Sequence, residues 1–155
     1  MATVNYKPEG YHTVTPYLIV RDAARAIDFY RRAFGAKELM RIAGTGGKIG
    51  HAEIQIGESR VCLADEYPEM GARSPETIGG SPVNFLVYVP DVDRVVEQAV
   101  AAGAKLKRAV ADQFYGDRIG GVEDPFGHTW YIATHKEDVA DDELQRRAAA
   151  MAQSK

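Results

Sequence analysis

The stretch PYLIVRDAARAIDFYRRAFGAK, residues 16–37, joins a short apolar run to an aspartate and then to apolar residues at helical spacing. Asp22 is well placed to cap a helix, because an aspartate side chain accepts hydrogen bonds from the free amides of the first turn. Gly35 is placed to end that helix. The stretch therefore predicts a strand followed by a helix, with a second strand from Glu38 to Ile42.

The same order of signals returns in residues 82–110, PVNFLVYVPDVDRVVEQAVAAGAKLKRAV. The two capping aspartates, Asp22 and Asp91, lie 69 residues apart, and so do Leu63 and Ile132. In each half, two runs of alternating apolar and polar residues then predict a β-hairpin. The first hairpin turns at Gly57-Glu58 and the second at Phe126-Gly127. The chain therefore predicts an α+β fold made of two tandem β-α-β-β-β modules.

The boundaries follow from composition. Residues 12–65 form the first expected module and 83–137 the second. Between them, residues 66–82 are rich in proline and glycine and are interpreted as a linker or long loop. Residues 138–155 are expected to form a C-terminal surface helix and tail, acidic at its start as the helix dipole favours.

Composition narrows the class of protein. The net charge is −3 with scattered basic residues, which argues against nucleic-acid binding. The single cysteine, Cys62, allows no internal disulfide and fits a reducing compartment. No apolar run reaches the ~18 residues needed to span a membrane. The expectation is a soluble, cytoplasmic protein without a membrane partner.

Three motifs, in order, carry a family resemblance: PYLIVRDAARAIDFYRRAFGAK, VYVPDVDRVVEQAVAAGAK and VEDPFGHTWYIAT. With this repeat, the chain resembles the vicinal oxygen chelate superfamily, the glyoxalase, bleomycin-resistance and dioxygenase proteins, over roughly residues 12–137. The combination of DQFYGDR, DPFGHTWYIATH and HAEIQIG is similar to the PhnB-like branch.

The resemblance implies a curved mixed sheet around a cavity, with the helices on its convex side. It also implies that enzymes of the group hold a divalent metal through four side chains, from the first and last strand of each module. Paired modules across subunits are common in the superfamily, so the resemblance implies a homodimer.

Side chains alternate across a strand, so parity predicts which of them face the cavity. The more apolar face of each strand should pack on the helices. The side chains expected on that face are Leu18, Val20, Ala52, Ile54, Ile56, Val61, Leu63, Phe85, Val87, Val89, Trp130 and Ile132. The metal positions implied by the resemblance fall on the other face, at Thr15, Cys62, Asn84 and Tyr131. None of these is a normal ligand for such a metal. No cofactor is therefore predicted, and a divalent metal is the alternative.

Other candidates each have a structural alternative. His51 and Glu53 share a strand face and could act as a base or as metal ligands, or simply form a polar sheet surface. Arg118 could bind a ligand, or pair with Asp112, Asp117 or a glutamate. Cys62 is either a reactive thiol or a small packing residue.

Tyr115 could line the mouth of the cavity or plug a loop. His128 and His135 look like a metal pair, but they differ in parity and cannot share an ion. His128 is expected on the helix side with Trp130, and His135 beyond the useful end of the strand.

The leading interpretation is a cavity protein that binds a small, partly aromatic molecule without the usual metal. The expected ligand-binding residues are Thr15, Tyr17, His51, Glu53, Cys62, Asn84, Tyr88, Tyr115, Arg118 and Tyr131. No catalytic residue is assigned. The alternative is a metal-dependent lyase, isomerase or dioxygenase of the same superfamily with a non-standard site near His51 and Glu53. A third possibility is a structural role through dimerisation.

Overall fold

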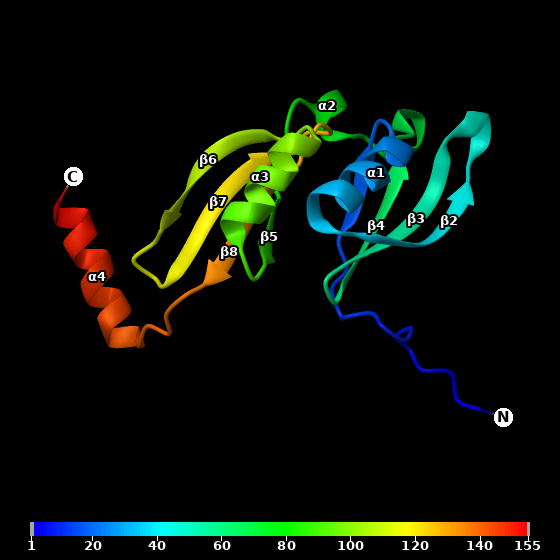
Figure 1. Cartoon of the computed structure of the whole chain (residues 1–155). Coiled ribbons are helices and arrows are strands. Elements are labelled where there is room, and N and C mark those ends of the chain that lie inside the picture. The colour runs from blue at the N-terminus through cyan, green and yellow to red at the C-terminus, as the bar shows by residue number, and fades with distance from the viewer. Residues whose placement is uncertain (1, 155) are drawn as a thin grey trace. The chain divides into compact units, whose positions relative to one another are not determined.

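The structure, a computed structural model, describes residues 2–154 and contains the β-α-β-β-β order twice (Figure 1). The first copy consists of β1 (Tyr17–Val20), α1 (Ala23–Phe34), β2 (Lys37–Ala43), β3 (Ile49–Ile56) and β4 (Ser59–Asp65). The second consists of β5 (Asn84–Tyr88), α3 (Val92–Ala102), β6 (Lys105–Asp112), β7 (Asp117–Glu123) and β8 (Thr129–His135). The α+β fold is confirmed.

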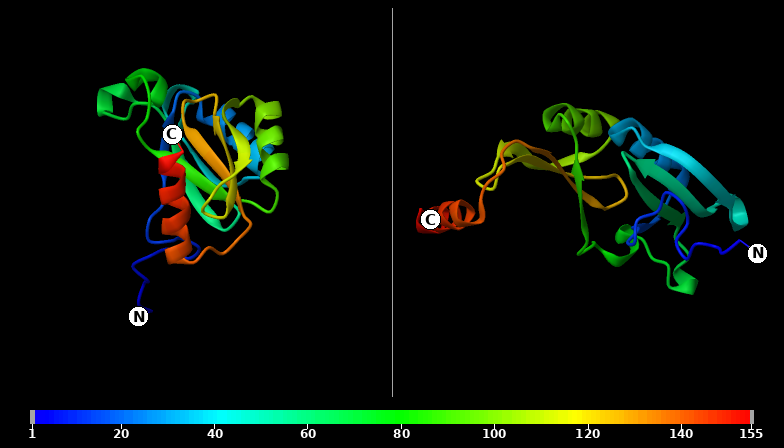
Figure 2. Two further views of the ribbon diagram at one scale, coloured as in Figure 1. Left: turned by 90° about the vertical axis from the view of Figure 1, so that its left-hand side faces the viewer. Right: turned by 90° about the horizontal axis from the view of Figure 1, so that it is seen from below.

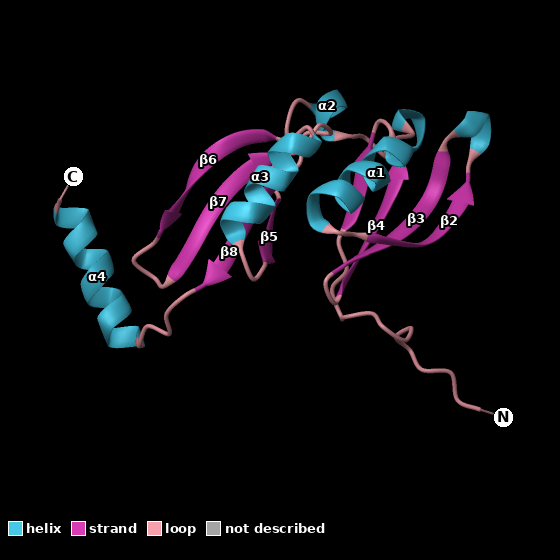
Figure 3. Cartoon of the chain, viewed as in Figure 1, coloured by secondary structure: helices cyan, strands magenta, loops and turns pink. Residues whose placement is uncertain are grey.

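Short helices fill the connections (Figure 3). The 3-10 turn η1 (Thr45–Gly47) joins β2 to β3, and η2 (Pro68–Met70) and α2 (Pro75–Ile78) lie between β4 and β5. The helix α4 (Asp141–Gln153) follows β8 and is drawn in red in Figure 2. No helix in the described part of the chain is long and apolar enough to cross a membrane.

The chain divides into two compact units. The first contains the chain up to Ser81 together with Pro125–Gly127, and the second contains Pro82–Asp124 and the chain from His128 onward. Each unit has one four-stranded sheet, ordered β1-β4-β3-β2 in the first and β5-β8-β7-β6 in the second. In both sheets the first strand runs parallel to the last one, and the other pairings are antiparallel.

The helix ends follow the local sequence signals. Asp22 accepts a hydrogen bond from the amide of Arg25, and Asp91 accepts one from the amide of Arg94. Gly35 ends α1 in the left-handed conformation, with a φ of 67°, which a residue without a Cβ adopts at no steric cost. The expected caps are therefore present in both modules, and the expected stop is present at the end of α1.

Each module has a second helix cap, which was not expected from the sequence. Asp65 accepts the amide of Ala23 at 2.9 Å in the first unit. Thr134 accepts the amide of Val92, also at 2.9 Å, in the second. Asp65 and Thr134 lie 69 residues apart along the sequence, and so do Ala23 and Val92. The last strand of each module thus holds the first turn of its helix.

Parity correctly predicts the packed faces of most strands. Leu18, Val20, Ala52, Ile54 and Leu63 are each at most 2% exposed, whereas Phe85 and Val87 of β5 are only half-buried. Trp130 and Ile132 are likewise fully buried. Burying one such side chain contributes about 1.5–3 kcal/mol, so the packed faces of the strands stabilise each module. The opposite face is free to carry polar groups.

The two histidines of the eighth strand have different outcomes. His128 is buried, on the side expected for it. The placement of His135 beyond the strand was wrong, because it is the last residue of β8 and pairs in register with Asp117. The ladder continues to this position because β7 already begins at Asp117, which gives His135 a partner.

Candidate functional site

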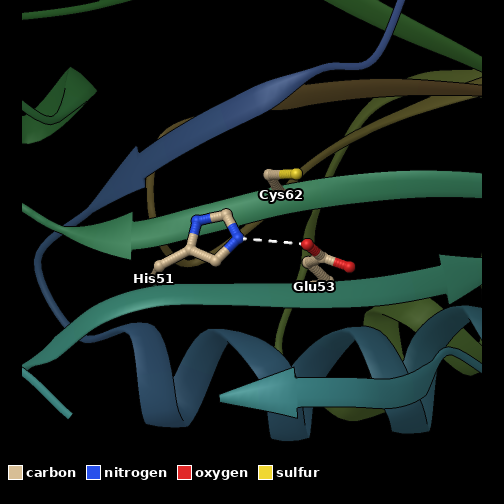
Figure 4. Close-up of side chains that lie close together, drawn as sticks. All are labelled: His51, Glu53 and Cys62. Carbon is tan, nitrogen blue, oxygen red and sulfur yellow. Dashed lines mark hydrogen bonds and ion pairs between the residues drawn. The ribbon is translucent and has the colours of Figure 1, made fainter. Parts of the chain in front are cut away.

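Three potential metal-ligating side chains converge on the sheet of the first unit (Figure 4). His51 and Glu53 come from β3, and Cys62 comes from the neighbouring β4, directly opposite Glu53 in the register. One donor atom from each lies within 4.8 Å of the other two. All three point away from the helix-packed face, because they have the opposite parity to Ala52, Ile54 and Leu63. The cluster brings together three of the residues expected at the site.

His51 is held on both of its ring nitrogens. Nε2 lies 3.2 Å from Oε1 of Glu53, and Nδ1 lies 2.7 Å from the hydroxyl oxygen of Tyr17. The rings of Tyr17 and His51 are 5.5 Å apart between centroids. Because the ring has a partner on each side, its orientation is fixed and Nε2 is directed at the cluster.

Glu53 is the electrostatic centre of the cluster. Hydrogen bonds from Tyr11 and from His51, with the nearby charge of Arg60, hold the pKa of Glu53 below its usual range. Arg60 approaches the second carboxylate oxygen, Oε2, at 3.5 Å. Glu53 is therefore ionised at neutral pH, with Oε1 facing His51 and Oε2 facing Arg60.

Cys62 and Tyr11 keep their protons in this environment. Burial raises the pKa of the Cys62 thiol. Burial, assisted by hydrogen bonding to Glu53, raises the pKa of the Tyr11 hydroxyl. Without a bound cation, Cys62 is a poor nucleophile, since the thiolate is the reactive form.

A hollow of about 400 Å³ lies beside this cluster on the first unit. The chain that precedes β1 forms most of its wall. It is lined by Tyr6, Lys7, Pro8, Tyr11, His12, Thr13, Thr15, Tyr17 and Cys62. Two residues expected from the family positions, Thr15 and Cys62, therefore line this open hollow.

Tyr11 and Arg60 contact Glu53 of the cluster but were missed in the sequence. Arg60 lies over the ring of Tyr11, with its guanidinium carbon 4.8 Å from the ring centroid. Tyr11 precedes any periodic segment, so no strand or helix pattern could orient it. Arg60 could have been found only through strand parity, because it lies two residues before Cys62 and therefore on the same strand face.

The remaining expected residues lie in the second unit. Asn84 and Tyr88 are exposed on β5, and Tyr131 is half-buried on β8. The ring of Tyr131 lies beside Gly121, where an added Cβ would be 3.0 Å from it. Tyr115 packs edge-on against Phe114, at 5.3 Å between ring centroids.

Arg118 is engaged by carboxylates. It donates to both oxygens of Asp93, at 2.8 and 2.9 Å, and to Asp112 at 3.2 Å. The expected ion pair with Asp112 is present, and Asp93 supplies the stronger contact. The guanidinium holds the pKa of Asp93 below its usual range. A ligand at Arg118 would have to displace at least one of these carboxylates.

Asp117 forms the centre of a second polar group, which the sequence did not reveal. It accepts a hydrogen bond from the Tyr88 hydroxyl at 2.8 Å and lies 2.7 Å from Nδ1 of His135. On its other side, His135 contacts Asp138 through Nε2 at 2.8 Å. These carboxylates raise the pKa of His135, Asp117 having the largest effect.

The residues at the four family metal positions do not fit such a metal. Thr15 and Cys62 stand in the first unit and Asn84 and Tyr131 in the second. A hydroxyl, an amide and a phenol are weak ligands, and one thiol cannot hold an ion alone. No chemistry is therefore assigned through a metal at those positions.

Relatives share most of the chain. The uncharacterized protein Mb0911c of Mycobacterium bovis is 43% identical over 145 residues, covering 92% of this chain and 93% of that protein. The uncharacterized protein At5g48480 of Arabidopsis thaliana is 32% identical over 127 residues, covering 76% of this chain and 74% of that protein.

Solved structures share the fold. The At5g48480 product from Arabidopsis thaliana aligns with a TM-score of 0.65 at 29% identity, over 79% of this chain and 98% of that one. TioX from Micromonospora sp. ML1 aligns with a TM-score of 0.62 at 28% identity, over 80% of this chain and 98% of that one. The family model described as Glyoxalase/Bleomycin resistance protein/Dioxygenase superfamily matches residues 11–132. The chain therefore belongs to the glyoxalase/bleomycin resistance/dioxygenase superfamily.

Proposed function

We propose that this chain binds a small, partly aromatic molecule in the hollow of its first unit, without the metal site usual in its superfamily. The observation that carries the proposal is the hollow of about 400 Å³ next to Tyr17 and Cys62. A concavity of this size suits a small organic ligand, for which apolar walls supply affinity and a few polar groups supply orientation.

The lining has both kinds of group. The rings of Tyr6, Tyr11 and Tyr17 offer flat surfaces on which an aromatic ligand can stack. Thr13 and Thr15 offer hydroxyls that donate or accept hydrogen bonds. Tyr17 also links the hollow to His51, so a ligand that reaches its hydroxyl would compete with the His51 nitrogen.

A screen of a chemically diverse small-molecule library by native mass spectrometry tests the proposal, with calorimetry on the hits. We expect a micromolar or tighter ligand whose affinity falls about tenfold, or ~1.4 kcal/mol, in Tyr17→Ala. Thr45→Ala is the control, because Thr45 lies in the same unit but outside the hollow. Binding that is unaffected by Tyr17→Ala and by Thr15→Trp would overturn the site.

The second-unit residues Asn84, Tyr88, Tyr115, Arg118 and Tyr131 stay predicted ligand contacts. Their substitution to alanine, measured with the same ligand, tests that part of the prediction. Because Arg118 already binds two carboxylates, we expect its substitution to have the smallest effect on ligand affinity.

We further infer membership of the PhnB-like branch, a cytoplasmic location and a homodimer. The branch rests on the motifs DQFYGDR, DPFGHTWYIATH and HAEIQIG. The homodimer is supported by the apolar side chains exposed on β5, where Leu86 is 53% and Tyr88 58% exposed. Light scattering should give a mass of twice 17.0 kDa, and a value equal to the single chain would contradict the dimer.

The alternative function is a metal-dependent lyase, isomerase or dioxygenase with a non-standard site. The observation in its favour is the convergence of His51, Glu53 and Cys62. Turnover of a hit compound that requires an added divalent metal would favour the enzyme over the binding protein.

A further inference from the structure

We propose that His51, Glu53 and Cys62 form a zinc site within the first unit, with ligands that differ from the family's four metal positions. Only Cys62 is shared with that set. The proposed site lies on two adjacent strands of one sheet and needs no residue from the second unit. It is independent of the proposed small-molecule binding, which can occur without zinc.

The donor atoms are close to the spacing that zinc requires. Bonds of about 2.0 Å to nitrogen and oxygen and about 2.3 Å to sulfur put tetrahedral ligand atoms roughly 3.3–3.6 Å apart. Nε2 of His51 and Oε1 of Glu53 already lie 3.2 Å apart. All three donors lie within 4.8 Å of one another, so side-chain movements on the order of 1 Å would bring them to tetrahedral spacing.

The chemistry of the three donors favours zinc over other common ions. A thiolate, an imidazole and a carboxylate together are a borderline-soft set, which Mg²⁺ and Ca²⁺ bind poorly. Three protein ligands leave one tetrahedral position for water or for a ligand. Because Cys62 also lines the hollow, that open position would be at the edge of the hollow.

The surrounding residues orient the ligands as outer contacts do in metal sites. Tyr17 holds Nδ1 of His51, which leaves Nε2 for the metal. Arg60 holds Oε2 of Glu53, which leaves Oε1. Among the residues that the structure describes, Nε of Arg60 is buried and has no hydrogen-bond partner, so Arg60 contacts Glu53 through Nη1.

Binding requires a balanced movement of protons. Cys62 gives its thiol proton to solvent and coordinates as the thiolate. The proton on Nε2 of His51 moves to Nδ1, where it is donated to the Tyr17 oxygen. A tyrosine hydroxyl can donate in one state and accept in the other, so Tyr17 supports both forms of the ring. Glu53 exchanges its contact with His51 for the metal.

The polar group around Asp117 does not make an equivalent site. His135 contacts Asp117 through Nδ1 and Asp138 through Nε2, so the two carboxylates lie on opposite edges of the ring. Their oxygens cannot share one ion with either nitrogen. Among residues 2–154, the His51 cluster alone brings three such donors this close together.

Cobalt(II) titration of the reduced, metal-free protein tests the site, because cobalt occupies zinc sites and is coloured. We expect one equivalent to give a near-ultraviolet thiolate-to-cobalt band and intense tetrahedral visible bands, both lost when zinc is added. Cys62→Ser should abolish the thiolate band. His51→Asn and Glu53→Gln should each weaken cobalt binding by about tenfold or more.

His135→Asn is a matched control, because it removes an imidazole outside both the cluster and the hollow and should leave the titration unchanged. Thermal melts establish that each variant is folded. If Cys62→Ser fails to fold, X-ray absorption of the zinc-loaded native chain decides, with one sulfur and the rest nitrogen or oxygen expected. Absence of a thiolate band, or cobalt affinity unchanged in both His51→Asn and Glu53→Gln, would overturn the site.

Discussion

The hydroxyl of Tyr17 lies 2.7 Å from Nδ1 of His51, although the two residues come from strands that are not neighbours in the sheet. β4 runs between β1 and β3, and Tyr17 is in register with Cys62 on β4. The tyrosine side chain therefore reaches across β4 to the histidine. Cys62 lies in the row between Tyr17 and Glu53, which places the thiol inside the cluster.

The first prediction concerns the tautomer of His51. In the metal-free protein we expect neutral His51 to carry its proton on Nε2, because Glu53 accepts there and the Tyr17 hydroxyl can donate to Nδ1. Zinc should shift the proton to Nδ1. Nitrogen-15 spectra of the imidazole distinguish the two tautomers. A proton on Nδ1 before metal is added would contradict this prediction.

Tyr17→Phe separates the effect of the hydroxyl from that of the ring. The ring and its packing stay, and only the partner of Nδ1 is removed. We expect zinc affinity to fall about tenfold, in the range seen for outer contacts of metal ligands. Tyr67→Phe is the control, because Tyr67 lies in the same unit away from His51. Equal zinc affinity in both variants would show that the hydroxyl has no such effect.

The second prediction concerns the two helix caps on the last strands. Asp65 accepts from the amides of Ala23 and Ile49 and is buried, so Asp65→Ala leaves two buried amides without partners. We expect a loss of about 2–4 kcal/mol of unfolding free energy. Thr134→Ala removes the hydrogen bond accepted from the amide of Val92 and the one donated to the carbonyl of Val89, and should cost about 1–2 kcal/mol.

Urea unfolding measures both losses, and amide exchange at Ala23 and Val92 localises them. Glu58→Ala, at an exposed turn, is the control and should change stability by no more than about 0.5 kcal/mol. A larger loss from Thr134→Ala than from Asp65→Ala would contradict this prediction.

The fold could be predicted from the sequence because its determinants are local. Asp22 and Asp91 cap helices through amides three residues away, and Gly35 supplies the conformation that ends the first helix. Strand parity then separates Leu18 from Tyr17 without any knowledge of the partner strands. The repeat of 69 residues applies each of these signals twice.

The site could be predicted only in part, because its contacts are long-range. His51 and Glu53 share a face by parity, but the approach of Cys62 depends on the register of β3 and β4. Tyr11 comes from a segment without periodicity. The pairing of His135 with Asp117 depends on where β7 begins, and a sequence signal for strand ends is weak.

The third prediction is that His135 titrates above the ordinary histidine pKa of about 6.5. Asp117 and Asp138 both stabilise its charged form. The raised folded pKa contributes stability that is fully present below the unfolded pKa and is lost as the pH rises through the folded one. Proton NMR titration measures it. Asp117→Asn should lower the pKa of His135 more than Asp138→Asn does, and the reverse order would contradict the assignment.

The fourth prediction concerns Glu66, whose carboxylate joins the end of β4 to the helix α2. It accepts from the Thr77 hydroxyl at 2.7 Å and from the amide of Ser74 at 2.9 Å, and it lies 3.5 Å from Arg21. The Thr77 bond is the main cause that lowers the pKa of Glu66 to about 2.

A lowered carboxyl pKa gives stability that is present above the unfolded pKa of about 4.3 and is lost as the pH falls through the folded value. At neutral pH we expect Glu66→Gln to cost about 1–2 kcal/mol, a figure reduced for solvent screening. The difference in unfolding free energy between Glu66→Gln and the native chain should shrink steadily below about pH 4.3. Urea unfolding across that range measures it, with Glu69→Gln as the exposed control. A difference that stays constant down to about pH 3 would mean that the loss comes from packing rather than from the charge.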